Sequence, residues 1–370
     1  MSLFRKGEPR RHEAQICQSC KELACLSTSI STNDESPQVL FQEAAKQKAK
    51  ASVSARPAFE SLPLMPDHPK SSSWGLWGNS DELGTLNLLT EEVVRKASEE
   101  IRTGRVVPLN LPLDCPLRPM NPLRKQCEHR INAKGHANDD ELDLNTQSSS
   151  HWDGLRHYPY QQTLQYYNGA TQSDISSFKP NYKIGVQNIA QKGIAGRGVL
   201  LDWRHYALKY KIKYSPFEAH AIPLSQLLEV AAEQNVQFCP GDILLIRSGW
   251  LEEYNKLTTH EQDALGRREK RTFCGVEASR DSIKWHWDNA FAAVAGDTTA
   301  YEAWPSLKPW GVSIHEVFLS GWGMPIGETW DLEGLAQACR ELGKWTFFLT
   351  SQPLNIKGGV ASPANVMAIL

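Results

Sequence analysis

The sequence lacks any apolar run long enough to cross a membrane. Its longest apolar stretches, such as 243–246 and 291–295, have the length of a β-strand, whereas a membrane-spanning helix needs roughly 20 apolar residues. The sequence also lacks an excess of either charge, because 40 lysines and arginines stand against 42 aspartates and glutamates. A nucleic-acid-binding protein usually has a strongly basic face. These absences argue against a membrane association and against a nucleic-acid partner.

The dense cysteine pattern of a small secreted scaffold is absent as well. The eight cysteines are scattered over 370 residues, and the charged start MSLFRKGEPRRHE is not followed by the apolar segment of a signal peptide. We therefore expect reduced thiols and a cytoplasmic protein. Cys17 and Cys20, with Cys25 nearby, either form a zinc or redox site or have this spacing by chance in a tail.

Residues 1–70 differ from the rest of the chain in composition. They contain a polar cluster at 27–36, a basic stretch at 42–51 and four prolines between 57 and 69. Few apolar positions repeat with any period, so we expect a partly disordered extension with one short helix near 39–50. That basic helix is either a targeting element or part of a solvated tail. A catalytic domain is expected over 71–370.

Strand and helix patterns alternate from Trp74 onward. We expect helices at 90–104, 224–234, 280–289, 315–322 and 332–342, and strands at 105–111, 198–202, 243–247, 291–295 and 344–350. A charged, irregular stretch at 123–145 is expected to contain a surface loop at 135–141. Alternating strands and helices joined by short turns predict a single α/β domain with a mixed sheet and flanking helices.

Tryptophan is abundant, with 12 residues, several of them beside Gly, Pro, Asp or His. Packing in the core and in loops explains this pattern. A pocket for a planar or apolar small-molecule substrate explains it too, because aromatic side chains combine a large area with a polar edge. We keep an aromatic substrate as one of the two interpretations.

The segment from Gln147 to His157, QSSSHWDGLRH, is the richest in reactive side chains. His151 and Asp153 alternate, so on an extended segment they point the same way. His157 follows a glycine that permits a turn. Two imidazoles and a carboxylate within seven residues suit a divalent metal ion. Three polar residues on an exposed loop would have the same spacing.

A second candidate segment runs from Ser313 to Glu328. His315 opens an apolar stretch, and Glu328 follows Pro325-Ile326-Gly327. A carboxylate buried in such a setting needs a partner or a raised pKa. A core histidine and a capping glutamate explain the same pattern. Asp297 follows a predicted strand, where an α/β protein has either a site residue or a structural cap.

Four further blocks carry a resemblance to a known family. They are WGNSDELGTLNLLT from Trp77, GRGVLLD from Gly196, PGDILLIRSGW from Pro240 and PLNIKGGVASP from Pro353. In their order and separation they resemble the putative cyclase family, which includes bacterial kynurenine formamidase and isatin hydrolase. The resemblance covers about Trp74 to Leu370. It implies the kynurenine-formamidase type of fold, a swivelling β/β/α domain, and a homodimer or homotetramer.

The family's metal motif, His-x-Gly-Thr-His-x-Asp-x-Pro-x-His, can be laid on the first candidate segment. Its second histidine, its aspartate and its last histidine match His151, Asp153 and His157. Gln147 stands at the first histidine, and Ser149-Ser150 replaces the Gly-Thr pair. This chain therefore departs from the family at one ligand and at the turn beside it.

By the same resemblance, the family's later histidine and glutamate correspond to two residues of the second segment. The implied site is one divalent ion, zinc or manganese, whose ligands are His151, Asp153, His315 and Glu328, with Gln147 a weak oxygen donor at most. The implied catalytic residues are His157 and Glu328. A histidine suits proton transfer because its ordinary pKa of about 6.5 is near neutral pH.

The implied activity is hydrolysis of an amide, formamide or lactam C–N bond in a small molecule. The replacement at Gln147 motivates an alternative, a metal-free lyase, dehydratase or cyclase of secondary metabolism that uses His157 and Glu328 as an acid–base pair. A non-catalytic binding protein on an enzyme fold is a third reading, since fold alone does not fix activity.

Overall fold

The computed structural model describes residues 56–176 and 181–370. The cysteine cluster at 17–25 and the helix expected near 39–50 lie outside these residues. Residues 56–70, which the composition assigned to the extension, lie against the domain. Phe59, in the short helix η2 (Phe59–Ser61), is buried, and the Arg56 guanidinium donates to the Trp287 carbonyl at 2.8 Å. Some residues before position 71 thus pack against the domain.

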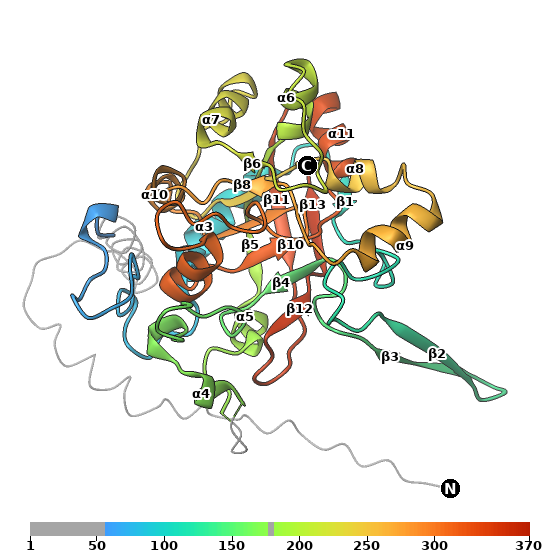
Figure 1. Cartoon of the computed structure of the whole chain (residues 1–370), viewed down its shortest axis with the longest axis horizontal. Coiled ribbons are helices and arrows are strands. Elements are labelled where there is room, and N and C mark those ends of the chain that lie inside the picture. Colours follow the sequence, from blue (N-terminus) through green and yellow to red (C-terminus); the bar gives the residue numbers. More distant parts are fainter. Residues whose placement is uncertain (1–55, 177–180) are drawn as a thin grey trace, which may run out of the picture. The chain divides into compact units, whose positions relative to one another are not determined.

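A nine-stranded mixed sheet runs through the described residues, in the order β1-β13-β11-β5-β7-β9-β10-β4-β12 (Figure 1). Four neighbouring strands are parallel: β5 (Ile194–Leu201), β7 (Ile243–Ile246), β9 (Ala293–Gly296) and β10 (Ile326–Glu328). The strands on either side pair antiparallel: β1 (Val106–Pro108), β4 (His151–Asp153), β11 (Thr346–Ser351), β12 (Ala361–Pro363) and β13 (Val366–Ile369). The mixed α/β class is confirmed.

Helices cover both faces of the central strands, so β7 and β9 are apolar throughout rather than alternating. In β7, Leu244 and Ile246 belong to one core, and Ile243 and Leu245 belong to the other. The first core includes side chains of α6 (Trp203–Lys209), α7 (Leu224–Glu233) and α10 (Arg280–Asp288). The second includes side chains of α11 (Glu333–Leu342).

Two predicted helices differ from the observed ones. Thr90 accepts a hydrogen bond from the Val93 backbone as an N-cap, but α3 (Glu91–Ala97) ends earlier than expected and passes into the 3-10 turn η4 (Ser98–Glu100). The helix expected at 315–322 is a π-helix, η6 (Glu316–Trp322), and is completely buried. Shorter elements complete the fold: η3 (Gly84–Leu88), η5 (Tyr167–Gly169), α4 (Gln172–Ser176), α5 (Val186–Lys192), β6 (Ala221–Ile222), α8 (Trp250–Tyr254), α9 (Thr259–Arg267) and β8 (Gly275–Val276).

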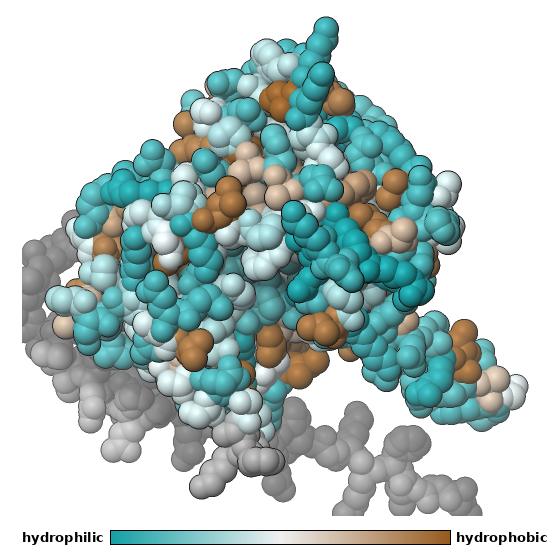
Figure 2. Space-filling model, in the orientation of Figure 1, coloured by the Kyte–Doolittle hydropathy of each residue, from teal (hydrophilic) through white to brown (hydrophobic). Residues whose placement is uncertain are grey.

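The prediction of a surface loop at 135–141 is confirmed for 135–137 and wrong for 138–141. Strands β2 (Glu128–Ala133) and β3 (Asn138–Asp143) form an antiparallel hairpin there, which stands clear of the domain with a mainly hydrophilic surface (Figures 1 and 2). Every residue of both strands is exposed. Such strands bury no face, so they do not show the apolar alternation from which strands are recognised. Within the described ranges, no helix is long and apolar enough to span a membrane.

Candidate functional site

The adjacent antiparallel strands β4 and β10 bring the predicted ligands together. Glu328 lies opposite His151, and Ile326 lies opposite Asp153. Because side chains alternate along a strand, His151 and Asp153 share one face of β4. Trp152 points to the other face, where its ring packs edge-on against Trp330 at a centroid distance of 4.7 Å. The strand therefore separates a polar cluster from an apolar core.

His151, Asp153 and Glu328 form a buried cluster whose ligand atoms lie within 4.8 Å of one another. His151 Nε2 is 3.4 Å from both Asp153 Oδ1 and Glu328 Oε2. Among the described residues, His151 Nε2 and Asp153 Oδ2 have no hydrogen-bond partner. A buried polar atom without a partner is costly, and a divalent ion that binds both atoms would remove that cost. The donor set therefore fits a metal ion.

His315, immediately before η6, lies beside this cluster. Its Nε2 is 3.0 Å from Glu328 Oε1, while its Nδ1 is 2.8 Å from the buried carboxylate of Glu302. The Nδ1 of His151 is similarly held, 2.7 Å from the Ser149 carbonyl. Both rings are thus fixed through Nδ1 and turn Nε2 toward carboxylates. Histidines that ligate metals are usually oriented in this way.

Gln147 and His157 lie on the more accessible side of the cluster. The Gln147 amide donates to Asp153 Oδ1 at 2.5 Å, and its nitrogen is 3.2 Å from His157 Nδ1. His157 Nε2 is 3.6 Å from Asp153 Oδ2, and 22% of the His157 side chain is exposed. Gln147 therefore lies against both Asp153 and His157. In this geometry it offers Asp153 a hydrogen-bond donor rather than offering an oxygen ligand.

Burial and neighbouring charges shift the pKa values of these groups in opposite directions. Burial disfavours protonation of His151, but the nearby carboxylates of Asp153 and Glu328, 3.4 Å from its Nε2, outweigh it and raise its pKa to about 9. Burial would raise the pKa of Asp153, yet the charges of His157 and His151 hold it well below its usual range. Burial lowers the pKa of His157, despite the nearby Asp153. The cluster thus combines ionised carboxylates with histidine Nε2 atoms. A proton and a metal ion would compete for each of these nitrogen atoms.

A cavity of about 200 Å³ adjoins the cluster. Four of its lining residues belong to the cluster or touch it: Gln147, His157, His315 and Glu328. Its aromatic lining residues are Tyr158, Phe273 and Trp304. An apolar cavity of about 150 Å³ is enough to bind benzene, so this cavity has room for one ring with a small substituent. Several tryptophans instead pack in the cores, Trp152, Trp250 and Trp322 among them.

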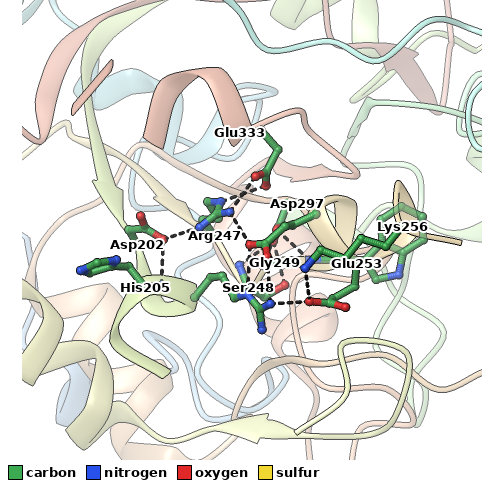
Figure 3. A network of polar contacts seen from close by, with 12 residues as sticks. Asp202, His205, Arg247, Ser248, Gly249, Glu253, Lys256, Asp297 and Glu333 are labelled. Atoms are coloured by element: carbon green, nitrogen blue, oxygen red, sulfur yellow. Dashed lines mark hydrogen bonds and ion pairs between the residues drawn. The ribbon is translucent and has the colours of Figure 1, made fainter. Parts of the chain in front are cut away.

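A second polar cluster lies after the carboxyl ends of β5, β7 and β9, where α/β proteins often bind ligands (Figure 3). Arg247 donates to Asp202 at 2.8 Å and to Glu333 at 2.9 and 2.6 Å. Asp297 accepts hydrogen bonds from the backbone and hydroxyl of Ser248 and from the next two backbone N–H groups. The carboxylates of this second cluster are thus paired within the protein, and Asp297 caps the start of α8. We assign this cluster a structural role.

Four residues near the candidate site were not identified from the sequence. Glu302 fixes His315, while Tyr158, Arg124 and Arg271 line the cavity. None of them belongs to a motif, and Glu302 is separated from His315 by 13 positions of irregular chain. Only the tertiary structure brings them to the cluster.

Comparisons with known proteins give a consistent relationship. The model of the putative cyclase family matches residues 64–303. A solved structure described as a novel cyclase is 31% identical, with a TM-score of 0.70, and the alignment covers 81% of this chain and 99% of that one. Isatin hydrolase A from Ralstonia solanacearum is 18% identical, with a TM-score of 0.51 over 71% of this chain and 91% of its own, and therefore shows the shared fold. The search of curated proteins gave no match. The chain belongs to the putative cyclase family.

Proposed function

We propose that this member of the cyclase family is a metal-dependent hydrolase that cleaves an amide, formamide or lactam C–N bond of a small molecule. One observation carries the proposal. Two buried ligand atoms, His151 Nε2 and Asp153 Oδ2, have no partner among the described residues, and they lie with Glu328 beside a cavity of substrate size. That isatin hydrolases share the fold supports hydrolysis as the reaction class.

The residues that would hold the ion are His151, Asp153, His315 and Glu328, a set of nitrogen and oxygen donors that suits zinc or manganese. A bound divalent ion polarises a carbonyl oxygen and lowers the pKa of water from about 15.7 toward about 7. Gln147 already donates to Asp153, so we propose that it is a weak ligand or none. Glu328 lies between the two imidazoles, which favours a ligand role over its predicted role in proton transfer.

His157 is the proposed catalytic residue. Burial lowers its pKa, which leaves it neutral at pH 7, and it lines the cavity with part of its ring exposed. A neutral imidazole accepts a proton from the attacking water as the water oxygen bonds to the carbonyl carbon. The C–N bond then breaks, and the protonated ring returns this proton to the leaving nitrogen. Asp153, close to His157 Nε2, stabilises the transient imidazolium.

A metal-free lyase, dehydratase or cyclase is the second candidate. It is favoured by the hydrogen bond between Gln147 and Asp153, which gives one carboxylate oxygen a protein partner in place of an ion. In that reaction His157 and Glu328 would exchange a proton with the substrate directly. The two candidates differ in whether turnover requires a metal and whether water is consumed.

The test combines metal analysis with turnover. Protein purified without chelator is expected to hold about one equivalent of zinc or manganese and to hydrolyse members of a panel of aryl formamides and lactams, including isatin. EDTA should abolish turnover and added metal should restore it. Asp153→Asn should lose both metal and activity, whereas His129→Ala, in the exposed hairpin, should keep both. Turnover with less than about 0.1 equivalent of metal, unchanged by EDTA, would contradict the proposal.

A further inference from the structure

Two arginines line the cavity without a carboxylate partner. Arg124 donates one hydrogen bond, from Nη1 to the Gln147 carbonyl at 2.9 Å. Arg271 makes no hydrogen bond or ion pair with the residues that the structure describes. Both side chains are half-buried. Guanidinium groups carry five N–H donors, so most donors of this pair are available to a molecule in the cavity.

Arg271 is unusual among the buried and half-buried arginines of the described chain. Arg56 and Arg268, like Arg124, donate to backbone carbonyls. Arg197, Arg204 and Arg247 each pair with carboxylates, and Arg156 donates to three backbone carbonyls. Arg102 also makes no hydrogen bond or ion pair within the described ranges, but it is exposed to solvent. Taking a cation partly out of water costs free energy unless an acceptor replaces the water. Arg271 bears that cost at the wall of a cavity.

The charge of the cavity points to the kind of acceptor. Glu328 is its one acidic lining residue, and the Glu328 carboxylate is already engaged by His151 and His315. The remaining wall therefore presents two positive charges with no fixed anion. A guanidinium binds a carboxylate or a phosphate through two parallel N–H···O bonds, and the smaller carboxylate suits a cavity of about 200 Å³ that also holds a ring.

The same cavity supplies contacts for an aromatic ring. Phe273, Trp304 and Tyr158 line it, and a tyrosine hydroxyl is a neutral hydrogen-bond donor at pH 7. The Tyr158 ring lies 5.5 Å from that of His315, which places an aromatic surface next to the proposed reaction centre. With about 200 Å³ of space, the cavity accepts one ring and a small polar group.

We propose that Arg124 and Arg271 bind a carboxylate of the substrate, so that the substrate is an aromatic amide, formamide or lactam that also carries a carboxylate. The substrate class rests on the proposed function, whereas the binding of an aromatic carboxylate does not. The arginines neutralise the anion and orient the ring, and the scissile group then faces His157. They are specificity residues, because they touch the substrate away from the reacting atoms.

Equilibrium binding tests this assignment without turnover. Benzoate and benzamide have nearly the same shape but differ in charge, and their dissociation constants are measured by calorimetry on the full chain as purified. We expect benzoate to bind about 10-fold more tightly than benzamide. Arg271→Gln and Arg124→Gln should each weaken benzoate binding about 10-fold and leave benzamide unchanged. Arg102→Gln should change neither constant.

Two results would overturn the assignment: benzoate bound no more tightly than benzamide, or benzoate binding that survives both cavity substitutions but is lost in Asp153→Asn. The second result would put the anion at the metal cluster. Arg271→Lys keeps the charge but not the bidentate donors, so it should weaken benzoate binding less than Arg271→Gln does. Thermal unfolding of each variant verifies that it is folded. Because no turnover is measured, arginine-dependent binding in a protein without hydrolytic activity would reject the proposed function and retain this carboxylate site.

Discussion

In the cluster of His151, Asp153, His315 and Glu328, one atom of a side chain is held by a protein neighbour while another atom faces the proposed metal position. Ser149 holds His151 and Glu302 holds His315, in each case through Nδ1. Asp153 accepts from Gln147 through Oδ1, while its Oδ2 has no partner among the described residues. The neighbouring groups therefore determine which atoms can receive an ion. Two predictions follow from these contacts.

Gln147→His is expected to tighten metal binding by about 10-fold, equivalent to about 1.4 kcal/mol. An imidazole nitrogen is a better ligand for zinc than a neutral amide, and the Gln147 side chain already reaches Asp153. Metal affinity is measured by competition with a chromophoric chelator. Gln147→Leu, which removes the amide without adding a ligand, is the control. Equal affinity of wild type and Gln147→His, with the fold intact, would show that position 147 does not face the ion.

Glu302→Gln is expected to weaken metal binding by about 10-fold or more through a loss of His315 orientation. The Glu302 carboxylate accepts from His315 N and Ile314 N and lies 2.8 Å from His315 Nδ1. Glutamine has an NH2 group in place of one carboxylate oxygen. This donor would face the N–H groups of Ile314 and His315, which need an acceptor. The same titration, with Glu269→Gln at an exposed position as control, measures the effect. Unchanged metal affinity in Glu302→Gln would remove Glu302 from the support of the site.

At the scale of elements, the site depends on the close packing of β4, β10 and β9. Gly327 lies between Ile326 and Glu328 in β10, opposite Trp152 of β4. A Cβ atom at this position would lie 2.6 Å from both the Ala295 Cβ and the Trp330 ring. The absence of a side chain at Gly327 therefore lets the strand that carries Glu328 sit close to its neighbours.

Gly327→Ala is accordingly expected to destabilise the fold by about 1–3 kcal/mol, the usual cost of overpacking a core, and to weaken metal binding. Gly334→Ala in α11 is the matched control, because its added Cβ would meet Val107 at an ordinary 3.4 Å, and alanine favours a helix by up to about 1 kcal/mol. Urea unfolding of both variants provides the comparison. A Gly327→Ala variant as stable as the wild type would contradict the packing argument.

Elements with a buried face were predictable from the sequence. The amphipathic helix at α7 and the buried strand β7 were expected nearly at their observed bounds, because apolar residues there follow the helical period or fill a short run. The hairpin β2–β3 was missed because it buries nothing, and the end of α3 was misjudged. His151 and Asp153 could be proposed from their alternation together with the family motif. Glu302, Arg124 and Arg271 could not, because only tertiary contacts place them at the site.

At the scale of the whole molecule, a titratable side chain buried in the core makes the free energy of unfolding depend on pH. His286 in α10 is completely buried, with Nδ1 2.7 Å from the Ser282 carbonyl and Nε2 2.9 Å from the Tyr301 hydroxyl. Burial lowers its pKa from 6.5 to about 4. Between these values the unfolded chain binds a proton that the folded chain does not, so the free energy of unfolding falls as pH decreases through this window.

From this shift, His286 should account for a loss of about 2 kcal/mol of stability between pH 7 and pH 5. His286→Gln keeps a polar side chain but cannot titrate, so its stability should decline less over the same interval. Urea unfolding of wild type and variant at both pH values measures the difference. The same pH dependence in the two proteins would show that His286 is not the responsible group.

The homodimer or homotetramer implied by the resemblance stays a prediction, which light scattering of the full chain tests.

The most direct measurement of the central claim is an anomalous difference map from crystals of the protein grown without chelator, recorded at the zinc and manganese absorption edges. The account predicts one peak about 2.0–2.2 Å from His151 Nε2 and from an oxygen of Asp153, with Glu328 and His315 completing the ligands. Gln147 should lie outside the usual ligand distance. A map without a peak at this position, with His151 and Asp153 hydrogen-bonded to protein groups instead, would contradict the metal centre and favour the metal-free reaction.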